Sequence, residues 1–322
     1  MREPRIVFVS DFPAAAGFAR EMVPAGYDMH VATGRDAACV AALAEAEYLV
    51  GFVDRFVDKA LFGQAPKLKL IQLLSAGYDN ADVEAARAVH VPICNNGGAN
   101  SVAVSEHAIL LMLAVSRQLV KQHANVAAGR WRGNAAPTLH ELRGKTLGIV
   151  GLGSIGKKTA RLALAFGMTV NYYDIARLSE AEEDALGVRF RLFREILRES
   201  DLISLHVPLN DRTRHMIDAA AFAEMRPETV LINTSRGPVV DEAALIDALT
   251  GGKIAAAGLD VFDQEPTPAD NPLLKLDNVT LTAHMAGPTF ESHKARVRNA
   301  FDNVQRVARG EAPLWVIPEL GR

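Results

Sequence analysis

Arg236, Glu265 and His284 are the residues of this chain best suited to acid–base and anion chemistry. Each comes after an apolar run that predicts a β-strand. A guanidinium holds a carboxylate with fixed, forked geometry. An imidazole transfers protons near neutral pH, and a neighbouring carboxylate favours its protonated form. Taken alone, each has an ordinary structural explanation: a surface arginine, a solvated acid and a structural histidine.

Together, the three side chains match the needs of one reaction, the transfer of hydride to a carbonyl. The carbonyl oxygen must gain a proton as the carbon gains hydride, and His284 can supply that proton. Glu265 can keep the imidazole protonated, and Arg236 can hold an acidic substrate in line. Ligands of open parallel sheets bind at the carboxyl ends of the strands, where all three residues are expected. We therefore expect a catalytic set that reduces an oxo acid.

A dinucleotide fingerprint strengthens this interpretation. The sequence Gly-Leu-Gly-Ser-Ile-Gly at 151–156 follows the apolar run 147–150 and opens a helix-like segment. Gly151 allows a tight turn, Gly153 lets the backbone approach a pyrophosphate, and Gly156 permits close packing of helix and strand. The N–H groups of the helix N-terminus then face the phosphates.

The expected strand after this helix ends at Asp174, close to the ~20-residue spacing of the fingerprint. A carboxylate here accepts hydrogen bonds from a ribose diol and repels a 2′-phosphate, so the cofactor is predicted to be NAD rather than NADP. Arg177 lies close enough in the sequence to weaken that preference.

Strands alternating with helices must position these residues. Continuous apolar strands of this kind indicate parallel sheets covered on both faces, here two doubly wound α/β lobes. The expected strands are 5–10, 30–33, 48–52, 69–74 and 91–94 in one series, and 145–150, 169–174, 202–207, 229–234, 255–261 and 279–283 in the other.

The second lobe is expected to be inserted into the first. A long helix from Val102 to about Gln122, with Ser101 as its N-cap, opens the inserted lobe, and a helix over 290–309 returns the chain to the first lobe. Hinges are expected near Asn100 and Gly287–Pro288. The stretch 123–144 lacks clear periodicity and is interpreted as an arm used in dimer contacts.

Composition restricts the partners. The chain has 322 residues, 49% of them hydrophobic, and a net charge of −3. It shows no basic block, so we expect no nucleic-acid partner. The longest apolar run, 108–115, is far below the ~20 residues of a membrane span, so we expect no membrane partner and a cytoplasmic protein. Cys39 and Cys94 lie outside any paired metal motif, so we expect no bound metal and a reducing compartment.

Five motifs in order now identify a resemblance. They are GLGSIG at 151–156, HVPL at 206–209, NTSRG at 233–237, GLDVFDQEP at 258–266, and His284. The chain resembles the D-isomer-specific 2-hydroxyacid dehydrogenases along nearly its whole length. The resemblance implies a Rossmann NAD-binding domain at 101–287, inserted into a flavodoxin-like substrate domain made of 1–100 and 288–322. It also implies a homodimer.

The resemblance implies a role for each matching residue. Arg236 would bind the substrate carboxylate and carbonyl, His284 would be the acid/base, and Glu265 would keep His284 protonated. His107 lies on a helix that is structural in this family and receives no role. Cofactor contacts are expected at Gly151, Gly153, Ser154, Ile155, Gly156, Asp174, His206, Pro208, Thr234, Ser235, Asp260 and Gly287, and substrate contacts at Ser75, Ala76, Gly77, Asn100, Arg236 and His284.

Alternatives remain within and beyond this family. Asp263 stands where the family often has Glu, and Ala283 where Pro is common, so no subfamily is assigned. The same scaffold oxidises formate, phosphite or phosphoglycerate in related enzymes. A different class is an NAD-sensing protein that binds partners, as related corepressors do. Trp131, in the expected arm, is interpreted either as reaching a partner subunit's cleft or as an anchoring aromatic.

Overall fold

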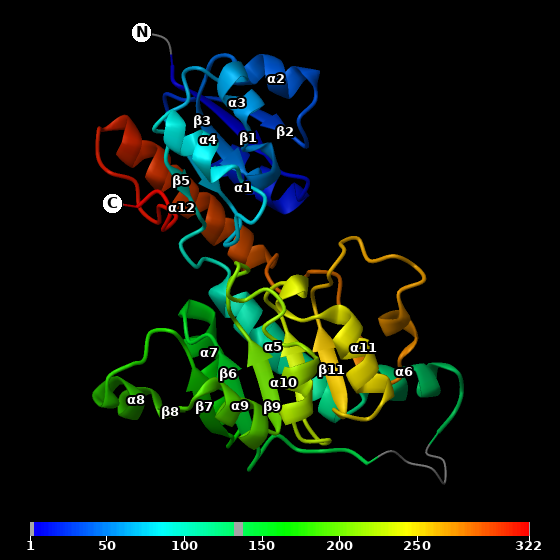
Figure 1. The fold of residues 1–322 in the computed structure, drawn as a ribbon. Helices are drawn as coiled ribbons and strands as arrows, with labels where there is room; N and C mark the ends of the chain where they lie inside the picture. Colours follow the sequence, from blue (N-terminus) through cyan, green and yellow to red (C-terminus); the bar gives the residue numbers. More distant parts are fainter. Residues whose placement is uncertain (1–2, 132–137, 322) are drawn as a thin grey trace. The chain divides into compact units, whose positions relative to one another are not determined.

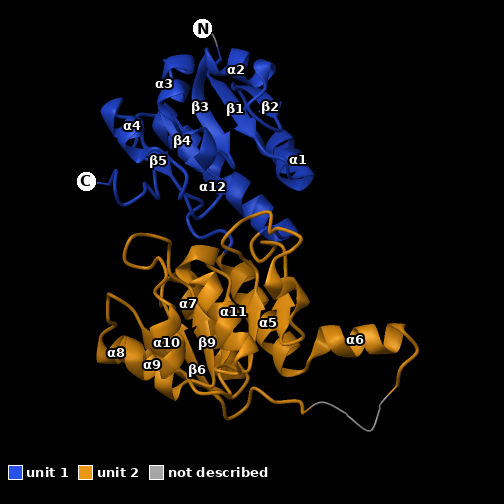
Figure 2. Cartoon of the chain, turned by 45° about the vertical axis from the view of Figure 1, so that its right-hand side comes forward, with its two compact units in different colours: residues 1–100, 288–322 blue, residues 101–287 orange. Residues whose placement is uncertain are grey.

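The computed structural model describes residues 3–131 and 138–321 (Figure 1). It splits into two compact units, shown in different colours in Figure 2. Unit 1 consists of Met1–Asn100 and Pro288–Arg322, and unit 2 of Ser101–Gly287. Each unit has a parallel sheet of its own.

Unit 1 has a sheet with the strand order β2-β1-β3-β4-β5. This is the order of a flavodoxin-like doubly wound sheet. The last helix of the chain returns to this unit and packs against α1 and β4. The elements are β1 (Arg5–Val9), α1 (Pro13–Met22), β2 (Asp28–Ala32), α2 (Ala37–Leu43), β3 (Ala46–Gly51), η1 (Asp54–Phe56), α3 (Lys59–Gln64), β4 (Leu70–Leu73), α4 (Val83–Ala88), β5 (Ile93–Cys94) and α12 (Phe290–Ala308).

Unit 2 has a sheet with the strand order β12-β11-β10-β9-β6-β7-β8. The order reverses between β6 and β9, which is the switch point of a Rossmann fold. The elements are α5 (Ser101–Ser116), α6 (Leu119–Ala127), β6 (Thr146–Val150), α7 (Ser154–Ala165), β7 (Thr169–Tyr173), α8 (Glu180–Leu186), β8 (Val188–Phe190), α9 (Phe193–Glu199), β9 (Leu202–Leu205), α10 (Ala219–Glu224), β10 (Val230–Asn233), η2 (Gly237–Val239), α11 (Glu242–Thr250), β11 (Ala256–Leu259), η3 (Pro272–Lys275) and β12 (Val279–Leu281).

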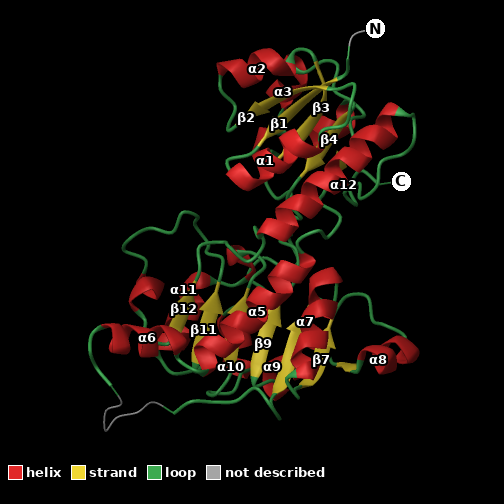
Figure 3. Cartoon of the chain, turned by 180° about the vertical axis from the view of Figure 1, so that it is seen from behind, coloured by secondary structure: helices red, strands yellow, loops and turns green. Residues whose placement is uncertain are grey.

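The predicted class of two parallel α/β sheets is confirmed, and the reason is burial on both faces. In unit 2, α5 and α7 cover one face of the sheet and α9, α10 and α11 cover the other (Figure 3). Central strands such as β9 are therefore buried at every position. Such strands read as continuous apolar runs in the sequence rather than as alternating ones.

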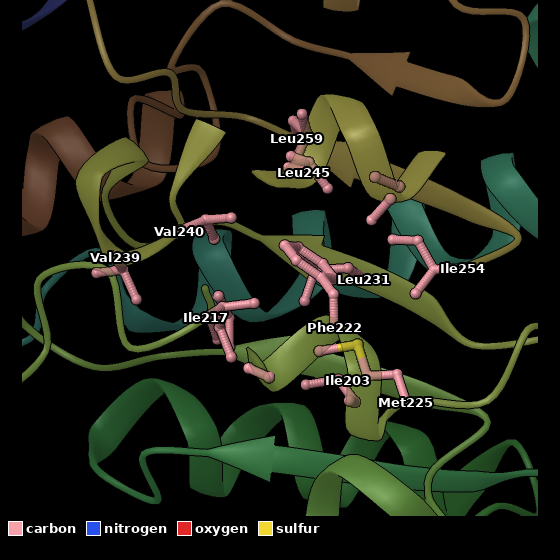
Figure 4. Close-up of a cluster of buried hydrophobic side chains, with 14 of the residues drawn as sticks. Ile203, Ile217, Phe222, Met225, Leu231, Val239, Val240, Leu245, Ile254 and Leu259 are labelled. Atoms are coloured by element: carbon pink, nitrogen blue, oxygen red, sulfur yellow. The ribbon is translucent and has the colours of Figure 1, made fainter. Parts of the chain in front are cut away.

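One apolar cluster fixes the strands that carry the expected catalytic residues (Figure 4). Ile203, Leu231 and Leu259 extend from β9, β10 and β11, and each is at most 2% exposed. Phe222 of α10 and Leu245 of α11 pack against them. Burial of each such side chain contributes on the order of 2 kcal/mol, so the strand ends are held on a rigid support.

The helix expected from Val102 to about Gln122 is wrong in its extent. It is two helices, α5 and α6, bent by 62° with respect to each other. Gln118 lies at the break in the left-handed region, with φ of 46°. The physical reason is packing: α5 buries ten residues against the sheet and α7, whereas α6 buries none. Within the described residues, no single helix is long and apolar enough to span a membrane, and α5 with α6 meets that criterion only as a bent pair.

Candidate active site

The glycine-rich turn of unit 2 lies between β6 and α7 and has little room for side chains. A Cβ on Gly151 would lie 2.7 Å from the carbonyl oxygen of His206, and one on Gly156 would lie 2.2 Å from that of Gly151. Gly151 also has φ of 95°, which side chains rarely tolerate. Gly153, by contrast, has open space where its side chain would be. The backbone of the turn therefore remains accessible to a ligand at Gly153.

The helix that follows this turn begins without a side-chain cap. Gly153 is the N-cap of α7, and its first turn, which contains Ser154 and Ile155, carries no acidic residue. Helices α10 and α11 differ, since Asp218 and Asp241 cap them through hydrogen bonds from backbone N–H groups. An uncapped N-terminus leaves N–H groups and the positive end of the helix dipole for an anion such as a pyrophosphate.

Asp174 follows β7 and faces the same turn. Its Oδ2 accepts a hydrogen bond from the Leu152 N–H at 2.6 Å, and its Oδ1 accepts one from the Ala176 N–H at 3.0 Å. The carboxylate is thus fixed beside the glycine turn, at the place where a ribose adjoining the pyrophosphate would lie.

The ends of β9 and β10 present two buried polar atoms. The Nδ1 of His206 and the Oγ1 of Thr234 have no hydrogen-bond partner within the part of the chain that the structure describes. The Nε2 of His206 lies 3.0 Å from Ser204 Oγ. Burial lowers the pKa of His206 to about 4, so its ring is neutral near pH 7. Buried polar atoms usually find partners, so these two fit a site that binds a polar ligand.

His284 and Glu265 form a direct pair. The Nδ1 of His284 lies 2.7 Å from Oε2 of Glu265, and their side chains are 46% and 33% exposed. Oε1 of Glu265 accepts a hydrogen bond from the Phe262 N–H. Burial acts to raise the pKa of Glu265, but the hydrogen bond and charge of His284, together with Phe262 and Arg236, lower it overall. The glutamate is therefore ionised near pH 7, so its carboxylate accepts a hydrogen bond from the His284 ring.

Arg236 lies at the end of β10, in a loop tightly packed against that of Glu265. Asn233 fixes this loop, since its Nδ2 donates to the Arg236 carbonyl and its Oδ1 accepts from Ser235. A Cβ on Gly237 would lie 1.8 Å from the carbonyl oxygen of Phe262, so only glycine lets the two loops meet. The structure thus brings Arg236, Glu265 and His284 to one edge of the sheet.

Asp260 holds the backbone on which His284 is carried. It is 1% exposed, and its carboxylate accepts hydrogen bonds from the N–H groups of Met285 and Ala286 at 2.8 and 2.9 Å. Its carbonyl accepts one from the N–H of His284 at 2.7 Å. His284 has φ of 53°, a conformation that costs a residue with a side chain about 1 kcal/mol and that these bonds stabilise.

His107 and Thr282 are absent from the predicted site, yet they adjoin Asp260. The Thr282 hydroxyl donates to Asp260 Oδ1 at 2.6 Å, and the Nε2 of His107 lies 2.9 Å from the Thr282 oxygen. Because that hydroxyl proton is directed at Asp260, His107 must donate to Thr282. The sequence carries no local signal for this chain of contacts, since His107 and Thr282 are 175 residues apart.

The substrate residues expected in the first lobe lie in unit 1. Ser75 follows β4, and its hydroxyl donates to the Gly77 carbonyl at 2.7 Å, with Ala76 exposed between them. Asn100 is buried, and its Oδ1 accepts a hydrogen bond from Asn96. Their contacts with a substrate stay predictions, as do the cofactor contacts of Pro208 and Gly287.

Similarity to known proteins assigns this chain to a protein family. Residues 109–286 match the model of the D-isomer specific 2-hydroxyacid dehydrogenase, NAD binding domain. The glyoxylate reductase of Thermococcus litoralis is 43% identical over 275 residues, which cover 84% of this chain and 82% of the relative. The chain belongs to the D-isomer specific 2-hydroxyacid dehydrogenase family. The expected NAD-dependent hydride transfer between 2-oxo and 2-hydroxy acids is confirmed at this level.

Solved structures agree with the assignment of this dehydrogenase. A glyoxylate reductase from Paecilomyes thermophila superimposes with a TM-score of 0.88 at 30% identity and covers 100% of both chains. The D-lactate dehydrogenase of Aquifex aeolicus, solved with NAD and lactic acid, has a TM-score of 0.81 at 28% identity, covering 95% of this chain and 96% of that one. The glycine turn, uncapped α7 and unpartnered polar atoms of unit 2 fit such a cofactor.

Proposed function

We propose that this dehydrogenase reduces small 2-oxo acids of the glyoxylate and hydroxypyruvate class to D-2-hydroxy acids with NADH. The observation that carries the proposal is the 2.7 Å contact between His284 and Glu265, next to the Arg236 loop. The names of the relatives favour this substrate class, since several that are 38–43% identical are named glyoxylate reductases.

His284 is the proposed acid. Its Nδ1 is engaged by Glu265, so Nε2 is the ring nitrogen that exchanges a proton with the substrate. NADH, when bound, would supply the hydride for the carbonyl carbon, and Nε2–H of His284 would donate the proton to the carbonyl oxygen. The negative charge of Glu265 stabilises the imidazolium before transfer and orients the ring throughout. In the oxidation direction, the neutral imidazole accepts the hydroxyl proton.

Arg236 is the proposed substrate anchor. Its guanidinium can hold the substrate carboxylate through two hydrogen bonds and keep the carbonyl in line with His284. The backbone N–H groups around Ala76 and Gly77 of unit 1 are proposed to contact the substrate carboxylate, and Ser75 and Asn100 are proposed to add further substrate contacts, as the family resemblance implies.

The cofactor is proposed to bind along the carboxyl edge of the unit 2 sheet. Gly151, Gly153, Gly156 and the first turn of α7 would receive the pyrophosphate. Asp174 would accept hydrogen bonds from the adenosine ribose. The remaining contacts are proposed for His206, Pro208, Thr234, Ser235, Asp260 and Gly287, of which Asp260 already carries the backbone bonds described above.

A substrate panel tests the proposal. NADH oxidation is followed with glyoxylate, hydroxypyruvate, pyruvate and bulkier 2-oxo acids, and the configuration of each product is determined. We expect the highest kcat/KM with glyoxylate and hydroxypyruvate, and D products wherever a stereocentre forms. A preference for bulky oxo acids would reject the substrate class. Binding of NADH without any turnover would instead support the NAD-sensing alternative.

A homodimer is proposed on the basis of α6 and its surroundings. Leu119, Val120 and Val126 of α6 are each more than half exposed, and Trp131 is 78% exposed. Of these, Val120 lines a cavity of about 860 Å³ in unit 2, together with other residues of α6, the segment around His140 and residues of β10, β11 and β12. Several exposed apolar side chains along one segment favour a protein interface there. Light scattering should give a dimer mass, which Val120→Glu with Val126→Glu should reduce to that of a monomer.

We also propose a cytoplasmic location. Cys39 and Cys94 are buried free thiols among the described residues. Buried free thiols suit a reducing compartment, where NADH-dependent metabolism takes place. Cell fractionation with an epitope-tagged chain would check the location.

A further inference from the structure

The loop after β7 carries two side chains with opposite effects on NADPH. Asp174 repels a 2′-phosphate, whereas a free guanidinium at Arg177, three residues further along, would attract one. Which of them determines cofactor selectivity depends on where Arg177 is held.

Arg177 is held by one side chain of α8 and one of β8. Its Nε donates to Oε1 of Glu183 at 3.1 Å, and its guanidinium carbon lies 5.1 Å from the centre of the Phe190 ring. The side chain is still 56% exposed, so the guanidinium is within reach of solvent and of other anions. Its position is therefore set by Glu183 and Phe190 rather than by steric confinement.

Glu183, the partner of Arg177, is buried and is itself held by hydrogen bonds. It is 3% exposed, and its carboxylate accepts hydrogen bonds from Tyr172 Oη at 3.0 Å and from the Phe190 N–H at 3.4 Å. Tyr172 Oη in turn accepts one from the Leu178 N–H, next to Arg177. Burial acts to raise the pKa of Glu183, but the hydrogen bonds from Arg177 and Tyr172 lower it overall. A buried, ionised carboxylate therefore faces the one partly exposed cation of this loop.

We propose that Glu183 is a cofactor-selectivity residue, because it withholds Arg177 from the 2′-position of the adenosine ribose. Discrimination against NADPH then has two components: repulsion by Asp174 and capture of Arg177 by Glu183. This inference rests on the proposed binding of the ribose at Asp174. It predicts that removing Asp174 alone opens the site to NADPH only in part, since the cation that would pair with the phosphate stays engaged.

The test measures kcat/KM for NADPH divided by kcat/KM for NADH with glyoxylate as the substrate. Asp174→Ala should raise this ratio, and Asp174→Ala with Glu183→Gln should raise it about tenfold further, the size of one charge-assisted hydrogen bond. Adding Arg177→Ala to that double variant should abolish the further gain. An unchanged ratio in the double variant, or a gain that survives Arg177→Ala, would overturn the proposal.

Asp184→Asn is the matched control. Asp184 is the next residue on α8, and its exposed carboxylate pairs with Arg189 at 2.8 Å. Removing that charge from the Asp174→Ala background should leave the ratio within about twofold, because Arg189 is not on the ribose loop. A gain equal to that of Glu183→Gln would show a general effect of charge and would contradict the specific role of Glu183.

A second variant avoids the buried carboxylate, whose replacement could impair folding. In the Asp174→Ala background with Glu183 intact, Arg177→Ala should leave the ratio within about twofold, since the cation is already withheld. A large fall would mean that Arg177 reaches the phosphate despite Glu183, and would overturn the proposal.

Binding of 2′,5′-ADP and 5′-ADP by calorimetry repeats the comparison without turnover. The ratio of their affinities should follow the same order among the variants. A chain that reduces no oxo acid would fail the proposed function, yet this affinity ratio would still support or reject the role of Glu183.

Discussion

Two carboxylates follow β11 five residues apart, and both contact the segment of His284, yet their surroundings differ. Asp260 is 1% exposed and accepts hydrogen bonds from backbone N–H groups and the Thr282 hydroxyl. The Glu265 side chain is 33% exposed and contacts the imidazole itself. One carboxylate thus holds the main chain, and the other contacts the ring of the proposed acid.

The difference shows how the active site separates support from chemistry. A buried carboxylate whose oxygens accept hydrogen bonds from backbone N–H groups and a hydroxyl stabilises one conformation of the main chain. A partly exposed carboxylate beside an imidazole can respond as that ring gains or loses charge. We therefore expect substitutions at Glu265 to alter catalysis and substitutions around Asp260 to alter stability as well.

The largest effect is expected at His284, because Glu265 contacts its ring and Asp260 holds its backbone. His284→Ala should lower kcat for oxo-acid reduction about 10²- to 10⁴-fold, the usual contribution of a general acid, while NADH still binds. Stopped-flow turnover and NADH fluorescence measure the two quantities. His123→Ala, at an exposed position of α6, is the control and should have wild-type kinetics. Turnover near the wild-type rate in His284→Ala would exclude the histidine as the acid.

Glu265→Gln against Asp260→Asn tests the division of roles. Glu265→Gln should lower kcat about 10- to 100-fold, because the ring of His284 loses the carboxylate that holds it and balances its charge. Its midpoint of thermal unfolding should fall by less than that of Asp260→Asn. Asp260→Asn places an amide N–H against backbone N–H donors, so it should lower the free energy of unfolding by about 1–3 kcal/mol. Equal losses of stability in the two variants would remove the distinction.

Thr282→Val should have a smaller effect through Asp260. The substitution keeps the shape but removes the hydroxyl between His107 and Asp260. We expect a loss of about 1 kcal/mol of unfolding free energy and a several-fold lower kcat, with KM for NADH unchanged. Thr282→Ser should restore both values. A Val variant with wild-type kcat, or a Ser variant that rescues nothing, would show that the hydroxyl does not position His284.

The comparison also shows which features the sequence could predict. Gly151, Gly153, Gly156 and Asp174 were predictable because turns, helix starts and strand ends leave local patterns. The bonds of Asp260 were not, because they reach 22 to 26 residues along the chain, and His107 lies farther still. The break at Gln118 could not be predicted for a related reason. The apolar pattern continues through Leu119 and Val120, whereas the surface of unit 2 against which α5 packs ends before them.

The smallest effect concerns acid stability, and its direction follows from the lowered pKa of Glu265. In the unfolded chain this carboxyl takes up its proton near the ordinary pKa of about 4.5, whereas in the folded protein it stays ionised to lower pH. Its contribution to stability is therefore complete above that value and is lost as the pH falls through the folded-state pKa. The midpoint of thermal unfolding of the wild type should approach that of Glu265→Gln as the pH falls below about 4.5. A gap between the two proteins that widens on acidification would contradict an ionised Glu265 paired with His284.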